Sequence, residues 1–220
     1  MLDARVADTD RAARLLDRRF GTHVVLGGVC GLAWAAGLRG FMAEVAGSES
    51  GIEWAGTFLY ILLPGVVTGA LLGLAEHIRT TGGRRWWRWL AFSPLAFSSV
   101  LVGQLLQTGS MLQGGGIGGG ALAVPLFGMA GGFAISGRGP AWARVICALM
   151  AMSPIPVWAM VATLVGGPGL ALDTARGAWV ALYFWSYLAV LAAACAIPHR
   201  TVVDRQAFDG RRPDLPRGRR

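Results

Sequence analysis

The charged residues of this 220-residue chain leave five long uncharged intervals, and this spacing constrains the fold more than any motif does. The intervals cover residues 20–38, 54–75, 89–137, 145–172 and 177–199. The shortest has 19 residues, and about 20 apolar residues cross the hydrocarbon core of a bilayer as a helix. Because backbone inside lipid must satisfy its own hydrogen bonds, helices are favoured there. The sequence therefore predicts an all-α, polytopic integral membrane protein.

The 49-residue interval 89–137 is too long for one crossing. A glycine-rich run at 108–120 interrupts it, and such a run disfavours helix. This interval is therefore predicted to hold two helices and a loop. The chain as a whole is expected to be a bundle of six membrane helices, at about 21–43, 55–77, 88–107, 119–136, 142–166 and 178–197.

Arginine placement predicts the orientation of the bundle. All 20 basic residues are Arg, and an even number of crossings puts 18 of them on one side, leaving Arg39 and Arg176 on the other. Basic segments stay in the cytoplasm during insertion, so both termini are predicted to be cytoplasmic. A chain rich in Arg, Ala and Gly that lacks Lys and Asn indicates a GC-rich bacterial genome, and we expect a bacterial inner membrane.

The two tails flank the membrane domain, which is predicted at 20–199. Residues 1–19 have an amphipathic pattern that fits a helix lying on the inner leaflet, or equally a solvated helical leader. Residues 200–220 carry seven Arg and are expected to stay disordered and to touch anionic lipid through charge. The bilayer and anionic lipids at the cytoplasmic face are the expected partners, and nucleic-acid binding is not expected.

Small residues recur every four positions in the first two spans. The first span has Gly27, Gly31 and Ala35, and the second has Gly65, Gly69 and Gly73. Such ridges let helix backbones approach closely. Packing of the two spans against each other is the favoured interpretation, and contact with a second copy or another membrane protein is the alternative.

Proline interrupts four of the predicted spans, at Pro64, Pro94, Pro125, Pro154 and Pro156. A proline lacks the backbone N–H and leaves a carbonyl without its helical partner. In a membrane that carbonyl needs a neighbour, water or a ligand. Packed kinks are the more common outcome, while broken helices that line a transport site are the alternative.

Arg39 continues the first ridge by one more step of four residues, so it is expected to face another helix near the outer surface. An arginine there needs an anion, either an acidic side chain or the carboxylate or phosphate of a ligand. Acidic candidates are Glu44, Glu49, Glu53 and Asp173, and Glu53 is the best internal partner because Glu44 lies about 140° round a straight helix.

Other polar residues are predicted on the same outer face. The candidate ligand-binding residues are Arg39, Glu44, Glu53, Gln104, Gln107, Asp173 and Arg176. Interfacial side chains that only reach for water are the competing interpretation.

Chemistry-bearing patterns are otherwise sparse. His23, His77 and His199 all lie at predicted cytoplasmic helix ends, and Cys195 lies four residues before His199 on one helical face. Ligands at that spacing could bind a metal, but no Cys-x-x-Cys or His-x-x-x-His pattern supports this, and interfacial histidines with buried, reduced thiols are the favoured interpretation. No catalytic residue, metal or cofactor is predicted. The sequence favours a small-solute binding or transport component with an outward-facing polar site. The alternatives are a non-catalytic membrane scaffold or assembly partner, and a membrane-embedded enzyme acting on a lipid-linked substrate.

Overall fold

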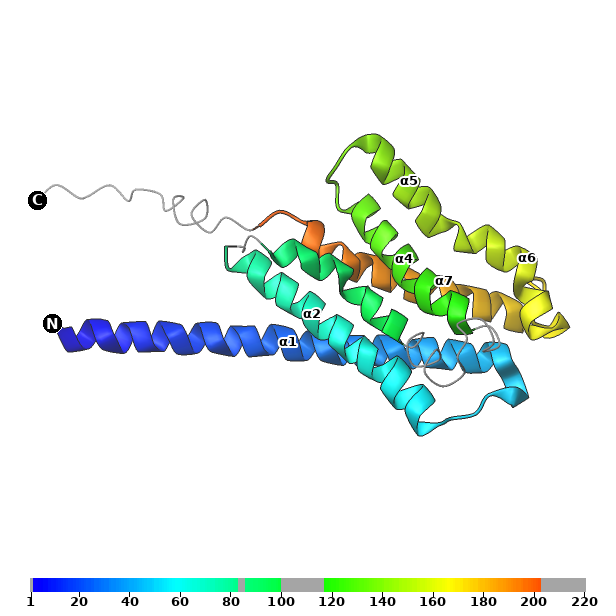
Figure 1. The fold of residues 1–220 in the computed structure, drawn as a ribbon, viewed down its shortest axis with the longest axis horizontal. Coiled ribbons are helices and arrows are strands. Elements are labelled where there is room, and N and C mark those ends of the chain that lie inside the picture. The colour runs from blue at the N-terminus through cyan, green and yellow to red at the C-terminus, as the bar shows by residue number, and fades with distance from the viewer. Residues whose placement is uncertain (1, 83–85, 100–116, 203–220) are drawn as a thin grey trace, which may run out of the picture.

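The computed structural model describes residues 2–82, 86–99 and 117–202, with the side chains of 2–18, 49 and 117–119 outside the description. The described part of the chain is helical apart from short connections, which confirms the all-α class (Figure 1). In chain order the elements are α1 (Leu2–Ala46), η1 (Gly47–Glu49), η2 (Trp54–Leu62), α2 (Leu63–Thr80), η3 (Trp87–Ser98), α4 (Ile117–Ile135), α5 (Ala141–Met152), α6 (Pro154–Gly166), η4 (Pro168–Leu170), α7 (Ala175–Cys195) and η5 (Ile197–His199).

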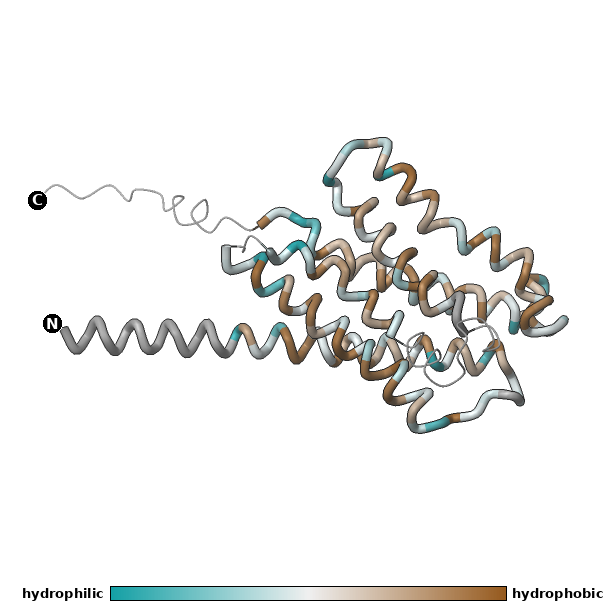
Figure 2. Tube along the Cα trace, viewed as in Figure 1, coloured by the Kyte–Doolittle hydropathy of each residue, from teal (hydrophilic) through white to brown (hydrophobic). Residues whose placement is uncertain are grey.

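Among the described residues, four helical segments are long and apolar enough to cross a membrane, at Arg19–Ala46, Trp54–Thr80, Ala141–Gly166 and Ala175–His199. A fifth apolar helix, Gly120–Ile135, is shorter. Of the predicted span 88–107, the structure describes only the 3-10 helix η3 and Ser99, and residues 100–107 lie outside it. Hydrophobic residues follow the helices, and hydrophilic ones gather at the connections (Figure 2). The chain thus has the helices of a multi-pass membrane protein.

Helix α1 is one continuous helix of 45 residues, about 68 Å long at 1.5 Å per residue. Its N-terminal part projects beyond the bundle, at the end where η5 leaves α7 (Figure 1). The predicted tail 1–19 therefore runs without a break into the first apolar stretch. Neither Gly nor Pro occurs before Gly21, so no residue stops the helix there.

Glycines bring α1 and α2 into backbone contact, the most extensive packing between any two described elements. A Cβ atom added to Gly69 would overlap the carbonyl oxygen of Gly27, and one added to Gly31 would overlap that of Gly65. Gly73 faces the His23 carbonyl in the same way. The small-residue ridges of the two helices therefore face each other inside the molecule.

A second glycine contact joins α4 to α7. A Cβ atom at Gly132 would overlap the backbone and side chain of Cys195, and one at Gly128 would overlap the side chain of Leu191. This contact was not predicted. The periodic small residues of α4 are spread over several faces, so the sequence does not show which face meets α7.

An aromatic core fills the space between α1, α6 and α7. Phe41 of α1 lies against Trp158 of α6 and against Phe184 and Tyr187 of α7, with ring centroids 5.1–5.5 Å apart. Trp34 donates a hydrogen bond of 2.8 Å from Nε1 to the Tyr187 carbonyl. These contacts fix α1 against α6 and α7.

Candidate anion site at the Arg39 end

Arg39 lies in the last two turns of α1, beyond the fully buried Ala35 of the ridge. The glycine contact between α1 and α2 sets the rotation of α1, so Arg39 points toward the segment that connects the two helices. This segment comprises η1, an extended stretch that starts at Ser50, and the first turn of η2. We call this part of the molecule the Arg39 end.

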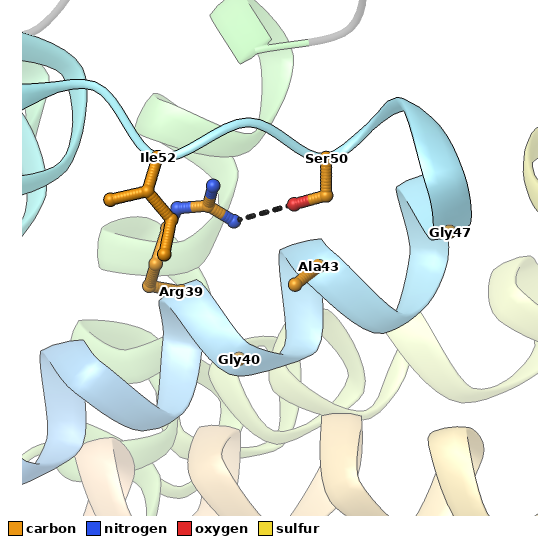
Figure 3. A pocket seen from close by; sticks show the side chains of 6 residues that line it. All are labelled: Arg39, Gly40, Ala43, Gly47, Ser50 and Ile52. Carbon is orange, nitrogen blue, oxygen red and sulfur yellow. Dashed lines mark hydrogen bonds between the residues drawn. The ribbon is translucent and has the colours of Figure 1, made fainter.

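Three neutral oxygen atoms hold the Arg39 guanidinium. Its Nε lies 3.4 Å from Thr57 Oγ1, its Nη1 donates to Ser50 Oγ at 3.2 Å, and its Nη2 donates to the Gly51 carbonyl. All three partners belong to the connecting segment, and Figure 3 shows the bond to Ser50. The guanidinium is thus fixed in place while its charge is not neutralised by any of these partners.

The predicted ion pair between Arg39 and Glu53 is not formed. Glu53 precedes η2, and its side chain is exposed beside Gly56. The ion pairs among the described side chains are Glu76 with Arg79 and Glu44 with Arg176. The prediction failed because the extended backbone at Gly51 supplies a carbonyl to the guanidinium, a partner that residue spacing alone does not reveal.

Glu44 pairs with Arg176 and not with Arg39. Arg176 Nε lies 3.7 Å from Glu44 Oε2, and Arg176 Nη2 donates to the Glu44 carbonyl at 2.8 Å. Both side chains are about half exposed. Two of the predicted ligand residues therefore tie the end of α1 to the start of α7. Asp173 is exposed in the connection before α7.

A pocket of about 350 Å³ opens beside the guanidinium. Its lining combines the Arg39 cation with small and apolar groups and one hydroxyl (Figure 3): Arg39, Gly40, Ala43, Gly47, Ser50 and Ile52. Gly40 contributes only backbone atoms to this lining. Gly47 turns the chain with a φ of 58°, a conformation that favours glycine.

The structure brings together only part of the predicted ligand set. Arg39 lines the pocket, whereas Glu44, Glu53, Asp173 and Arg176 are not among its lining residues. Gln104 and Gln107 lie outside the described residues. The sequence analysis missed Ser50, Thr57 and Ile52, although the hydroxyls clustered after α1 are a signal that could have drawn attention to them.

Protein hydroxyls bind the carbonyls that lie four residues before two of the prolines, and the Met150 carbonyl also accepts from the Ser153 N–H at 3.3 Å. Ser98 Oγ lies 3.4 Å from the Ala121 carbonyl, four residues before Pro125. Ser153 Oγ donates at 2.7 Å to the Met150 carbonyl, four residues before Pro154. These carbonyls have partners in the protein, so neither break needs a ligand.

The other predicted proline breaks lie in the first turn of an α-helix or inside a 3-10 helix. Pro64 opens α2 directly after the π-helical η2, where Leu63 N donates to the Phe58 carbonyl. Pro94 lies inside the 3-10 helix η3, where Thr68 donates to the neighbouring Ser93 carbonyl at 3.1 Å. Pro156 lies in the first turn of α6. Each break therefore has a local structural role.

Within the part of the chain that the structure describes, no three His, Cys, Asp or Glu side chains lie together as metal ligands would. No family model, curated protein or solved structure matches the chain. The functional argument therefore depends on the geometry of the Arg39 end.

Proposed function

We propose that this protein is a solute-binding or transport component of a membrane and that it binds a small anion at the Arg39 pocket. One observation carries the proposal: the Arg39 guanidinium lines an open pocket, and its three hydrogen-bond partners are all neutral oxygens. A guanidinium at a helix interface in a membrane protein is costly without an anion, and a carboxylate or phosphate provides one.

The lining suggests the chemical class of the solute. Ala43 and Ile52 offer apolar surface on either side of the cation, and Ser50 offers a hydroxyl. A small carboxylate with a short apolar chain matches this combination, because the carboxylate reaches Arg39 while the chain covers Ile52. Ile52 is 79% exposed, so a bound apolar chain can bury apolar surface there.

The scaffold and enzyme alternatives receive less support. The glycine ridges that could dock another membrane protein pack α1 against α2 instead. An enzyme acting on a lipid-linked substrate would need an acid or base beside the cation, and neither Glu44 nor Glu53 lines the pocket.

The test measures ligand-induced stabilisation of the purified full chain in detergent, with hexanoate, inorganic phosphate and phosphatidylglycerol as separate probes. A ligand that binds the folded state alone raises stability by RT ln(1 + [L]/Kd), about 2.7 kcal/mol at a hundredfold excess over Kd. We expect hexanoate to raise the melting temperature of the native protein. Arg39→Gln should abolish that shift relative to its own ligand-free baseline.

Two matched variants control for loss of charge at the same end. Arg176→Gln and Glu53→Gln should each keep the hexanoate response, because neither residue lines the pocket. A hexanoate response that persists in Arg39→Gln would refute the pocket. A response to phosphatidylglycerol alone, lost in Arg39→Gln, would identify a lipid headgroup as the ligand and contradict the solute proposal. Radiolabelled hexanoate uptake into proteoliposomes then separates transport from binding.

A further inference from the structure

The opposite end of the bundle carries a second group of arginines, arranged around η5. The short helix η5 packs against the ends of α2, η3, α4 and α7, so it lies where four elements meet. Its last residue, His199, is half buried, and its ring lies edge-on against Phe133 of α4 at a centroid distance of 5.5 Å. We call this part of the molecule the His199 end.

Arg138 reaches this end from the turn after α4. The turn reads Gly137-Arg138-Gly139, and both glycines have positive φ, 76° and 85°. Gly139 packs directly on the Phe133 ring that also contacts His199. Phe133 is therefore shared between η5 and the turn that carries Arg138.

Arg88 approaches from η3, which also packs against η5. Arg88 is the second residue of η3 and Arg138 follows α4, and both η3 and α4 contact η5. The two arginines, 50 positions apart in sequence, thus lie on elements that meet at η5, the short helix that ends at His199. Among the described residues, neither guanidinium has a hydrogen-bond acceptor or an ion-pair partner.

Neighbouring charges at this end do not neutralise the two arginines. The acidic residue described nearby is Glu76, which is occupied by Arg79 through two bonds of 2.6 and 2.7 Å. Arg144, on the next helix, donates instead to the Ala134 carbonyl at 3.1 Å and so caps the end of α4. Arg88 and Arg138 therefore remain a pair of cations without a counter-charge from the described side chains.

Exposed indole rings flank both arginines. Trp86 and Trp89, 72% and 64% exposed, lie on either side of Arg88 in the chain, and Trp142, 68% exposed, lies four residues after Arg138. Tryptophan prefers the headgroup layer of a bilayer. Both arginines are thus placed at the depth where lipid phosphates lie.

We propose that Arg88 and Arg138 form a binding site for the phosphodiester headgroup of one anionic phospholipid, held against His199 at the junction of η3, η5 and the turn after α4. The headgroup supplies the missing negative charge, and the neighbouring indoles hold its glycerol region. The site is at the other end of the bundle from the Arg39 pocket and does not depend on it.

The experiment titrates the purified full chain in detergent with dioleoylphosphatidylglycerol or dioleoylphosphatidylcholine, with melting temperature and native mass spectrometry as readouts. Phosphatidylglycerol should bind and stabilise the protein, while phosphatidylcholine and inorganic phosphate should do so much less. Arg88→Gln and Arg138→Gln should each weaken phosphatidylglycerol binding about fivefold, since one arginine near a membrane surface contributes on the order of 1 kcal/mol. Because one headgroup contacts both, the double variant should differ from the product of the single effects.

Arg19→Gln is the matched control, because it removes an exposed charge from α1 at the same end. It should keep the native affinity for phosphatidylglycerol, as should Arg39→Gln. Equal weakening by Arg19→Gln would show diffuse charge attraction and overturn the site. Independent, multiplicative effects of the two variants would refute a shared headgroup, and loss of binding in Arg39→Gln alone would assign the lipid to the other end.

Discussion

The Tyr183 hydroxyl of α7 donates a hydrogen bond of 2.6 Å to the carbonyl oxygen of Gly37 in α1. Tyr183 lies over a short glycine face of α1 made by Gly37 and Gly40. A Cβ atom at Gly40 would lie 2.8 Å from the hydroxyl oxygen, whereas one at Gly37 would lie at an ordinary 3.6 Å. The second glycine of this pair therefore makes room for the hydroxyl, and the first supplies its acceptor.

This geometry predicts that Gly40→Ala and Tyr183→Phe partly compensate for each other. Gly40→Ala should lower the free energy of unfolding by about 1–3 kcal/mol, the usual range for overpacking. Removing the hydroxyl leaves the ring carbon at 3.7 Å as the nearest atom, which a Cβ tolerates. The double variant should therefore be more stable than the sum of the two single losses predicts.

Gly37→Ala is the control for this cycle and should be neutral or slightly stabilising, because alanine favours helix and meets no close atom. Thermal unfolding in one detergent measures all four proteins. Strict additivity of Gly40→Ala and Tyr183→Phe would show that the hydroxyl does not occupy the space above Gly40.

The backbone contact between α1 and α2 predicts that alanine substitution has very different effects on stability at two helical glycines, Gly69 and Gly21. Gly69→Ala should destabilise the protein by about 1–3 kcal/mol, because the new Cβ overlaps the Gly27 carbonyl and backbone cannot move aside easily. Gly21→Ala should be neutral or stabilising, since nothing lies within 4 Å of its Cβ position. Yield and melting temperature in detergent report both effects, and equal behaviour of the two variants would contradict the packing.

The spacing of charges carries most of the fold information in this sequence. The predicted spans 21–43, 55–77, 142–166 and 178–197 each lie inside a helical segment long and apolar enough to cross a membrane. Such segments are readable because lipid demands both length and internal hydrogen bonding. The helix type could not be predicted, because hydropathy does not distinguish the π-helical η2 or the 3-10 helix η3 from an α-helix. The count of six and the orientation stay predictions.

The hydrogen bond from Ser153 to the Met150 carbonyl predicts that the cost of losing the Ser153 hydroxyl depends on Pro154. Ser153→Ala should cost about 0.6 kcal/mol, a typical value for a hydrogen bond inside a membrane protein. In a Pro154→Ala background the same change should cost less, because the new backbone N–H can bind the Met150 carbonyl in place of the hydroxyl.

Ser186→Ala is the matched control for Ser153→Ala. Ser186 donates to the Tyr183 carbonyl at 2.8 Å, with the same three-residue spacing. The residue four positions after Tyr183 is Tyr187, which has a backbone N–H, and not a proline. Its loss should therefore cost less than that of Ser153. A cost for Ser153→Ala that is unchanged by Pro154→Ala would show that the hydroxyl does not compensate for the proline.

The candidate site was less predictable than the helices because its partners come from the connecting segment. Arg39 could be singled out, since its place on a four-residue repeat is a property of sequence alone. Its bond to the Gly51 carbonyl depends on how the chain turns after α1, and charge spacing carries no information about that turn. The sequence analysis therefore favoured Glu53 as the partner of Arg39 because of its opposite charge. In the structure the guanidinium binds nearby neutral oxygens instead.

The contact between Glu44 and Arg176 has two parts, which predicts unequal effects of removing either partner. Glu44→Gln removes only the half-exposed charge pair, so the free energy of unfolding should fall by less than about 1 kcal/mol. This loss should be smaller at high salt, which screens the pair in the native protein. Arg176→Gln also removes the 2.8 Å bond to the Glu44 carbonyl and should cost more. Chemical or thermal unfolding at low and high salt measures both variants. A larger loss from Glu44→Gln would mean that the charge pair, and not the main-chain bond, ties α7 to the end of α1.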